Sequence, residues 1–66
     1  MSKCVVKIWF KDGDIGFYKS DDGDTVHFSS SPVGATKYGQ FAAGFKAGYL
    51  EPHYSGIIDY CDVKVL

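Results

Sequence analysis

Hydrophobic and polar residues alternate in three short runs over the first half of the chain, at residues 4–10, 15–19 and 25–28. Alternation with a period of two is typical of strands that bury one face. Asp-Gly pairs at residues 12–13 and 22–23 separate the runs. This dipeptide favours a two-residue hairpin turn, because a type I′ turn needs positive φ at both central residues. The pattern therefore predicts a three-stranded antiparallel meander.

Two-residue turns at these pairs set the register of the meander. They place Ile8 opposite Phe17 and gather one apolar set on a single face. That set is Cys4, Val6, Ile8, Phe10, Ile15, Phe17, Val26 and Phe28. The opposite face carries Val5, Lys7, Trp9, Tyr18, Thr25 and His27. We expect the first face to be the core and the second to be the surface that carries the function.

Residues 33–49 carry apolar side chains at the spacing of a helix. They are Tyr38, Phe41, Ala42, Phe45 and Tyr49. Ser31 suits an N-cap and Pro32 suits the first helical position. We therefore expect a helix from about Pro32 to Ala47, followed by a loop over residues 50–56 that is marked by proline and glycine.

Residues 57–66 alternate again and predict a fourth strand, which we expect to lie beside the first. The predicted fold class is α+β, with a three-stranded antiparallel meander, one helix packed on one face and a C-terminal fourth strand. We expect residues 1–66 to form a single small domain. A chain of this length buries only about 60% of its unfolded surface, so we expect its aromatic residues, 17% of the composition, to supply much of the core.

The formal net charge is −1, so no overall basic charge draws the chain toward nucleic acid or an anionic membrane. No apolar stretch has the length of a membrane span, and Lys3 leads directly into the first strand with no secretion signal. These features predict a cytoplasmic protein without a membrane partner, monomeric or weakly dimeric. Cys4 and Cys61 are then expected to be reduced, and a disulfide remains open if the terminal strands are neighbours.

The residue types that ligate metals or catalyse reactions lack the spacing that such sites need. Cys4, His27, His53 and Cys61 form no close pair of the zinc type, and the Asp turns lack the calcium-loop pattern. His27 shares its strand face only with Ser29, and no nucleophile elbow, phosphate loop or dinucleotide fingerprint occurs. We therefore expect no catalytic residue, no metal, no cofactor and no enzymatic activity.

Trp9, Tyr18 and His27 on the second face are amphipathic side chains typical of protein interfaces. Acidic residues gather at the two turns, namely Asp12, Asp14, Asp21, Asp22 and Asp24. They suit a protein partner with a basic, nucleic-acid-binding surface, and the alternative is that they serve only the turns. His53 and Tyr54, in the predicted loop, are further contact candidates. In size, charge and lack of catalytic residues the chain resembles small acidic phage-encoded inhibitors, which implies inhibition by mimicry of nucleic acid.

The same strands allow a second interpretation. The sequences Lys-Ile-Trp-Phe at residues 7–10, Gly-Phe at 16–17 and Val-His-Phe-Ser at 26–29 resemble the strand motifs of the cold-shock domain. The resemblance implies a barrel whose base-stacking surface is formed by Trp9, Phe17, His27 and Phe28. The register above places Trp9 and Phe17 on opposite faces, whereas a cold-shock surface needs them together. Single-stranded nucleic acid is therefore the alternative partner.

Overall fold

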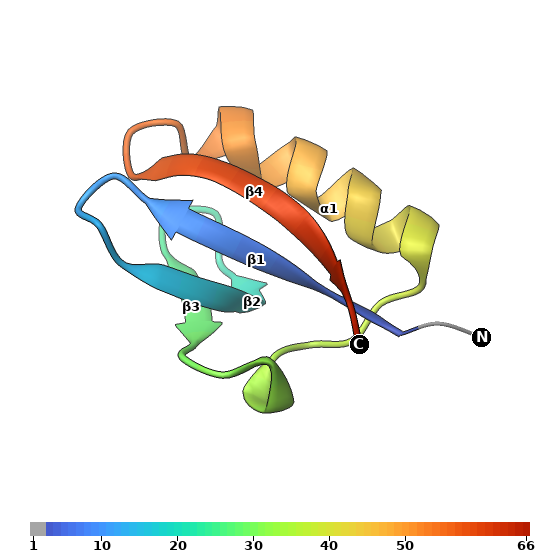
Figure 1. The fold of residues 1–66 in the computed structure, drawn as a ribbon. Helices are drawn as coiled ribbons and strands as arrows, with labels where there is room; N and C mark the ends of the chain where they lie inside the picture. The colour runs from blue at the N-terminus through green and yellow to red at the C-terminus, as the bar shows by residue number, and fades with distance from the viewer. Residues whose placement is uncertain (1–2) are drawn as a thin grey trace.

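A computed structural model describes residues 3–66. The elements along the chain are β1 (Cys4–Phe10), β2 (Ile15–Asp21), β3 (Val26–Ser29), the 3-10 turn η1 (Pro32–Gly34), α1 (Gln40–His53) and β4 (Ile58–Val65). The strands form one antiparallel sheet in the order β3-β2-β1-β4. Figure 1 shows α1 on one face of this sheet, along β4 and β1. The predicted α+β fold is confirmed, as is the place of the last strand beside the first.

The turn between β1 and β2 holds one residue more than predicted. The Phe10 N–H donates to the Asp14 carbonyl oxygen at 2.8 Å, and the Gly13 N–H donates to the Phe10 carbonyl oxygen at 3.1 Å. Gly13 has a φ of 97°, which favours glycine. Residues 11–13 therefore form a three-residue hairpin loop that ends in a left-handed residue.

This longer loop shifts β2 by one residue and exchanges its two faces. Ile8 lies opposite Gly16, and Lys7 lies opposite Phe17, so the predicted pairing of Ile8 with Phe17 is wrong. Tyr18 consequently turns toward α1, where it is only 3% exposed.

The turn between β2 and β3 also differs from the prediction. The Asp22 N–H donates to the Thr25 carbonyl oxygen at 3.2 Å, so the central residues are Gly23 and Asp24. Gly23 has a φ of 96°. Lys19 is an extra residue in β2, where the pairing with β3 shifts, and this bulge keeps the apolar side chains of β3 on the side of α1.

The main core lies between the sheet and α1. Its buried members are Cys4, Val6, Ile8, Tyr18, Val26, Ala43, Leu50, Tyr54, Ile58 and Cys61. A smaller buried cluster of Val5, Phe17 and Ala35 lies on the other face, where Figure 1 shows η1 and the chain that follows it. Ile15 and Phe17 thus leave the predicted core face, because β2 is shifted by one residue.

The helix is displaced from its predicted range of residues 32–47. Ser31 and Pro32 do begin a helical turn, and the Ser31 side chain accepts a hydrogen bond from the Val33 N–H at 3.2 Å. This turn is η1, however, and α1 begins later and includes Pro52 in its last turn. The first part of the predicted loop over residues 50–56 is therefore helical.

The buried side of α1 is not the predicted aromatic stripe. Ala43 and Leu50 are fully buried and Ala47 packs against the core, whereas Phe41 and Phe45 are 85% and 80% exposed. Small side chains let the helix backbone approach the sheet closely, so α1 packs through its alanine side and turns its phenylalanines to solvent.

Cys4 and Cys61 are both free and buried. They lie on neighbouring strands, but Cys4 pairs with Val65 and Cys61 pairs with Ile8. This offset of four residues is about 13 Å along the strands, too far for a disulfide. Burial, and then the charge of Glu51, raise the pKa of the Cys61 thiol to about 12.

The outer edge of β4 is occupied by carboxylates. Glu51 Oε1 accepts a hydrogen bond from the Cys61 N–H at 2.8 Å, and Asp62 Oδ1 accepts one from the Val63 N–H at 2.9 Å. Residues 61 and 63 direct their backbone groups to the same side of the strand. The carboxylates therefore take donors that an additional strand would need at this edge.

Asp21, the last residue of β2, accepts hydrogen bonds from three tyrosine hydroxyls. Tyr18 donates to Oδ1 at 2.5 Å, while Tyr54 and Tyr49 donate to Oδ2 at 2.7 Å and 3.3 Å. Lys46 Nζ lies 5.3 Å from the ring centroid of Tyr18 and 5.1 Å from that of Tyr49. This cluster joins the end of β2 to the C-terminal half of α1.

The hydrogen bonds change the ionisation of the groups in the cluster. The hydroxyls of Tyr18 and then Tyr54 lower the pKa of the Asp21 carboxyl. Burial, and then the hydrogen bond to Asp21, raise the pKa of Tyr18 above its ordinary range and that of Tyr54 to about 12. Asp21 is therefore an ionised acceptor at neutral pH, and the tyrosines are neutral donors.

We expect Asp21→Asn to lower the free energy of unfolding by about 1–3 kcal/mol at neutral pH, because the substitution removes a charged acceptor. Since folding lowers the pKa of Asp21 from 3.8, its contribution is complete above that pH and is lost as the pH falls through the folded-state value. In urea denaturation, the free energies of unfolding of wild type and Asp21→Asn should therefore differ at neutral pH and converge in acid. Asp14→Asn, at an exposed carboxylate, is the matched control. A difference for Asp21→Asn that persists unchanged in acid would contradict this assignment.

Candidate functional site

The structure separates the three side chains that were expected on one functional face. Trp9 lies on the sheet face that points away from α1, whereas Tyr18 lies in the core between sheet and helix. The prediction that these two residues share a face is wrong, because the first turn is one residue longer. His27 is exposed on β3 and alternates with the buried Val26, so it points away from α1.

Trp9 forms an aromatic stack with Tyr60, its neighbour on β4. The ring centroids are 4.3 Å apart and the planes differ by 7°. Lys7 Nζ lies 4.8 Å from the centroid of the Trp9 ring. Phe17 is now on the same face as Trp9, but it is 8% exposed and packs with Ala35. The accessible aromatic surface here is the Trp9–Tyr60 pair.

His53 is the last residue of α1 and not part of the predicted loop, whereas Tyr54 caps the helix and begins the turn that follows. The His53 ring stacks on Tyr49 with centroids 4.9 Å apart, and its Nε2 lies 3.2 Å from the Gly23 carbonyl oxygen. Tyr54 is only 6% exposed and donates to Asp21. Both residues hold the end of the helix against the second turn, so Tyr54 is not part of an exposed contact surface.

Three of the five candidate aspartates accept hydrogen bonds, each at a different place in the structure. Asp21 binds the tyrosines described above. Asp12 Oδ1 accepts a hydrogen bond from the Asp14 N–H at 2.9 Å, and Asp22 Oδ1 accepts one from the Asp24 N–H at 3.0 Å. In each turn, one carboxylate oxygen is thus used to stabilise the turn itself. All four turn aspartates remain exposed to solvent.

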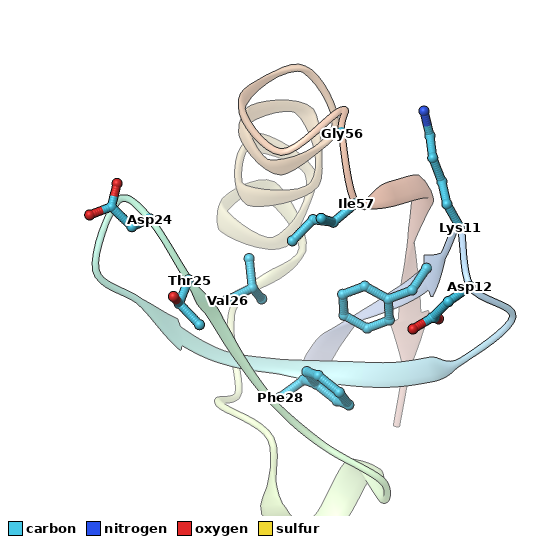
Figure 2. A pocket seen from close by; sticks show the side chains of 9 residues that line it. Lys11, Asp12, Asp24, Thr25, Val26, Phe28, Gly56 and Ile57 are labelled. Atoms are coloured by element: carbon cyan, nitrogen blue, oxygen red, sulfur yellow. The ribbon is translucent and has the colours of Figure 1, made fainter.

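A cleft of about 430 Å³ opens on the α1 side of the sheet, beside the helix. Its apolar lining consists of Phe10, Val26, Phe28 and Ile57, and its polar rim includes Lys11, Asp12, Asp24 and Thr25. Figure 2 shows Asp12 and Asp24 at opposite ends, with Val26 and Phe28 on the sheet between them. The cleft is therefore an apolar floor with a carboxylate at each end.

Gly16 fixes the position of one ring in this floor. A Cβ at Gly16 would lie 2.2 Å from Cδ2 of Phe28, so any larger residue would displace the ring. Phe28 also contacts Phe10, with ring centroids 4.6 Å apart. Phe28 is 42% exposed even so, and it is thus held in place while it remains available to a ligand.

The cleft runs along β3, an edge strand of the sheet. Thr25 directs its carbonyl oxygen toward β2, where it accepts a hydrogen bond from Asp22. Backbone groups alternate in direction along an antiparallel strand, so Val26 and Phe28 direct theirs away from β2. The same two residues therefore supply apolar side chains to the cleft and backbone groups to the edge.

Sequence reasoning assigned Phe10, Val26 and Phe28 to the core and missed the cleft. A signal was nevertheless present, because the sequence predicts one helix for four strands. A helix is about 10 Å wide and strands are about 4.8 Å apart, so one helix covers about two strands. Part of that face had to remain uncovered, although the pattern did not show which part.

The described residues 3–66 contain no group of three or more His, Cys, Asp or Glu side chains placed to hold a metal ion. Over the same residues, α1 falls short of the length and apolar character that a helix needs to cross a membrane.

No family model, curated protein or solved structure matches this chain. Its function is therefore argued from the cleft, the acidic turns and the aromatic stack.

Proposed function

We propose that this protein binds, without catalysis, an extended segment of a partner protein that carries both basic and apolar side chains. The observation that carries the proposal is the cleft, with its apolar floor and the exposed carboxylates of Asp12 and Asp24 at its ends. Apolar side chains of the segment would be removed from water on the floor. Its cations would meet the carboxylates at the ends.

The charge around the cleft supports a basic partner. Residues 11–14 and 22–25 contain four aspartates and one lysine, all exposed. Carboxylates in this arrangement attract Lys and Arg and raise the rate of association at low salt. The seven residues of β2 span about 20 Å between the two turns, a distance that about six extended residues of a partner cover.

The free edge of β3 supports an extended conformation for the bound segment. A partner strand laid along β3 would pair with the backbone groups of Val26 and Phe28, and alternate side chains would point over the cleft. The corresponding edge of β4 has its donors occupied by Glu51 and Asp62. Strand addition is therefore favoured at β3.

Basic segments are what nucleic-acid-binding proteins present to phosphates. When such a segment is held in the cleft, its Lys and Arg side chains are no longer available to bind nucleic acid. We therefore infer that the interaction inhibits the partner. Both cysteines are free thiols, which fits a reducing compartment such as the cytoplasm.

A labelled peptide of about ten alternating Lys and Val residues tests this proposal by fluorescence anisotropy. We expect saturable binding that weakens as salt rises, and no binding of the matching Glu-Val peptide. Asp24→Lys should weaken binding by about tenfold, because it turns an attraction at one end of the cleft into a repulsion.

Asp59→Lys is the matched control, since it makes the same charge change at an exposed position on β4 that does not line the cleft. It should leave the affinity nearly unchanged. Equal weakening by both variants would mean that the peptide responds only to net charge. Failure of the Lys-Val peptide to bind at low salt would contradict the proposal.

A second candidate function, stacking of single-stranded nucleic acid, has one observation in its favour. The observed register brings Trp9 and Phe17 to one face, as the cold-shock resemblance requires, with Lys7 beside Trp9. Phe17 is covered by Ala35, however, and the open sheet is not the barrel that the resemblance implies. On that face the Trp9–Tyr60 pair and the exposed His27 ring are left for bases to stack on.

A fluorescence titration of Trp9, the sole tryptophan, with a mixed-sequence single-stranded oligonucleotide separates the two functions. We expect no saturable quenching, because one face of the indole is already stacked on Tyr60 and few cations surround it. Quenching that saturates and weakens as salt rises would instead favour nucleic acid. Tyr60→Ala is the control, since it exposes more of the indole without altering the cleft.

A further inference from the structure

The solvent side of α1 is apolar over most of its length. Phe41 and Phe45 are 85% and 80% exposed, and Tyr49 is 41% exposed. Ala43 and Leu50 face the sheet on the other side of the helix. α1 therefore presents two aromatic rings, about one helical turn apart, on the side opposite Ala43 and Leu50.

The charged side chains of α1 do not interrupt this surface. They are Lys46 and Glu51. Lys46 Nζ lies over the rings of Tyr18 and Tyr49, and Glu51 binds the backbone of β4. Both are held toward the sheet, so another apolar surface could cover the outer side of α1 without desolvating a charge.

Gly44 and Gly48 lie beside the exposed phenylalanines. A Cβ at either position would meet no atom within 4 Å, so packing within the chain does not require glycine there. Glycine also makes a helix less stable than alanine would. Both glycines therefore leave exposed notches next to the rings, where a second surface can approach the helix backbone closely.

We propose that this surface binds a second copy of the chain, with the two α1 helices antiparallel about a two-fold axis. Along the helix the positions Phe41, Gly44, Phe45 and Gly48 alternate between ring and notch. In an antiparallel pair, Phe41 packs on Gly48 of the partner subunit, and Phe45 packs on Gly44 of the partner subunit. A two-fold interface requires such self-complementarity, whereas a parallel pair would set ring against ring.

The available area sets the strength of this dimer. A phenylalanine buries about 150–250 Å², so the two rings contribute about 300 Å² or more per copy. With Ala42, the two glycines and Pro52, the dimer would bury on the order of 1,000 Å² in total, near the lower limit for specific interfaces. The dimer is therefore specific and weak, and it forms as concentration rises.

Sedimentation velocity over about 5–500 µM tests the proposal. The mass should rise from the 7.3 kDa of one chain toward twice that value. Phe45→Glu should stay monomeric and folded, because this side chain is exposed in the single chain. Gly44→Ala with Gly48→Ala should raise the thermal midpoint of the monomer and still weaken association by about tenfold, because it fills the notches.

Val33→Ser is the control, since Val33 is 85% exposed on η1, away from α1. It should leave association unchanged. A wild-type chain that stays monomeric over the whole range would overturn the proposal. So would alanine variants that associate as strongly as wild type, because the notches would then play no part. The test is independent of the cleft and of its ligand.

Discussion

The carboxylate of Asp21 joins the sheet to the helix, and the rest of the architecture depends on that junction. Its donors come from β2, from the C-terminal half of α1 and from the residue that caps the helix. The contact ties the C-terminal end of α1 to the end of β2, while the rest of the helix packs over β4 and β1. The chain after that end supplies Ile57 to the wall of the cleft. One ionised group thus helps to fix the end of the helix beside the cleft.

The strands and their order could be predicted from the sequence, but the register could not. An Asp-Gly pair suits both a two-residue and a three-residue loop, because Gly13 supplies a positive φ in either. The choice between them depends on distant contacts. The longer loop turns Tyr18 into the core beneath α1 and places Gly16 beneath the Phe28 ring. Neither contact is visible in the alternation of polar and apolar residues along the strands.

The prediction of the helix failed for a related reason, because α1 has two apolar sides. Periodicity reports that a side is apolar, but not which side packs on the sheet. The prediction placed the aromatic side of the helix, with Phe41 and Phe45, against the sheet. Ala43 and Ala47, however, allow the helix to approach the sheet more closely. The candidate site was predicted in a similar, partial way. Aspartates at the turns indicated an acidic surface, while the apolar floor between them depends on which strands the helix leaves uncovered.

The two proposed surfaces differ in charge, and the difference argues for different partners. If two copies of the cleft came together, the carboxylates of Asp12 and Asp24 would repel those of the other copy. A basic partner would instead be attracted by the same carboxylates. The outer side of α1 carries no charge and alternates rings with notches, so a second copy meets no such repulsion. Because this side points away from the sheet and the cleft opens beside the helix, occupation of one surface leaves the other accessible. A dimer through α1 would then present two acidic clefts, and a partner with two basic segments would be held more tightly than by one.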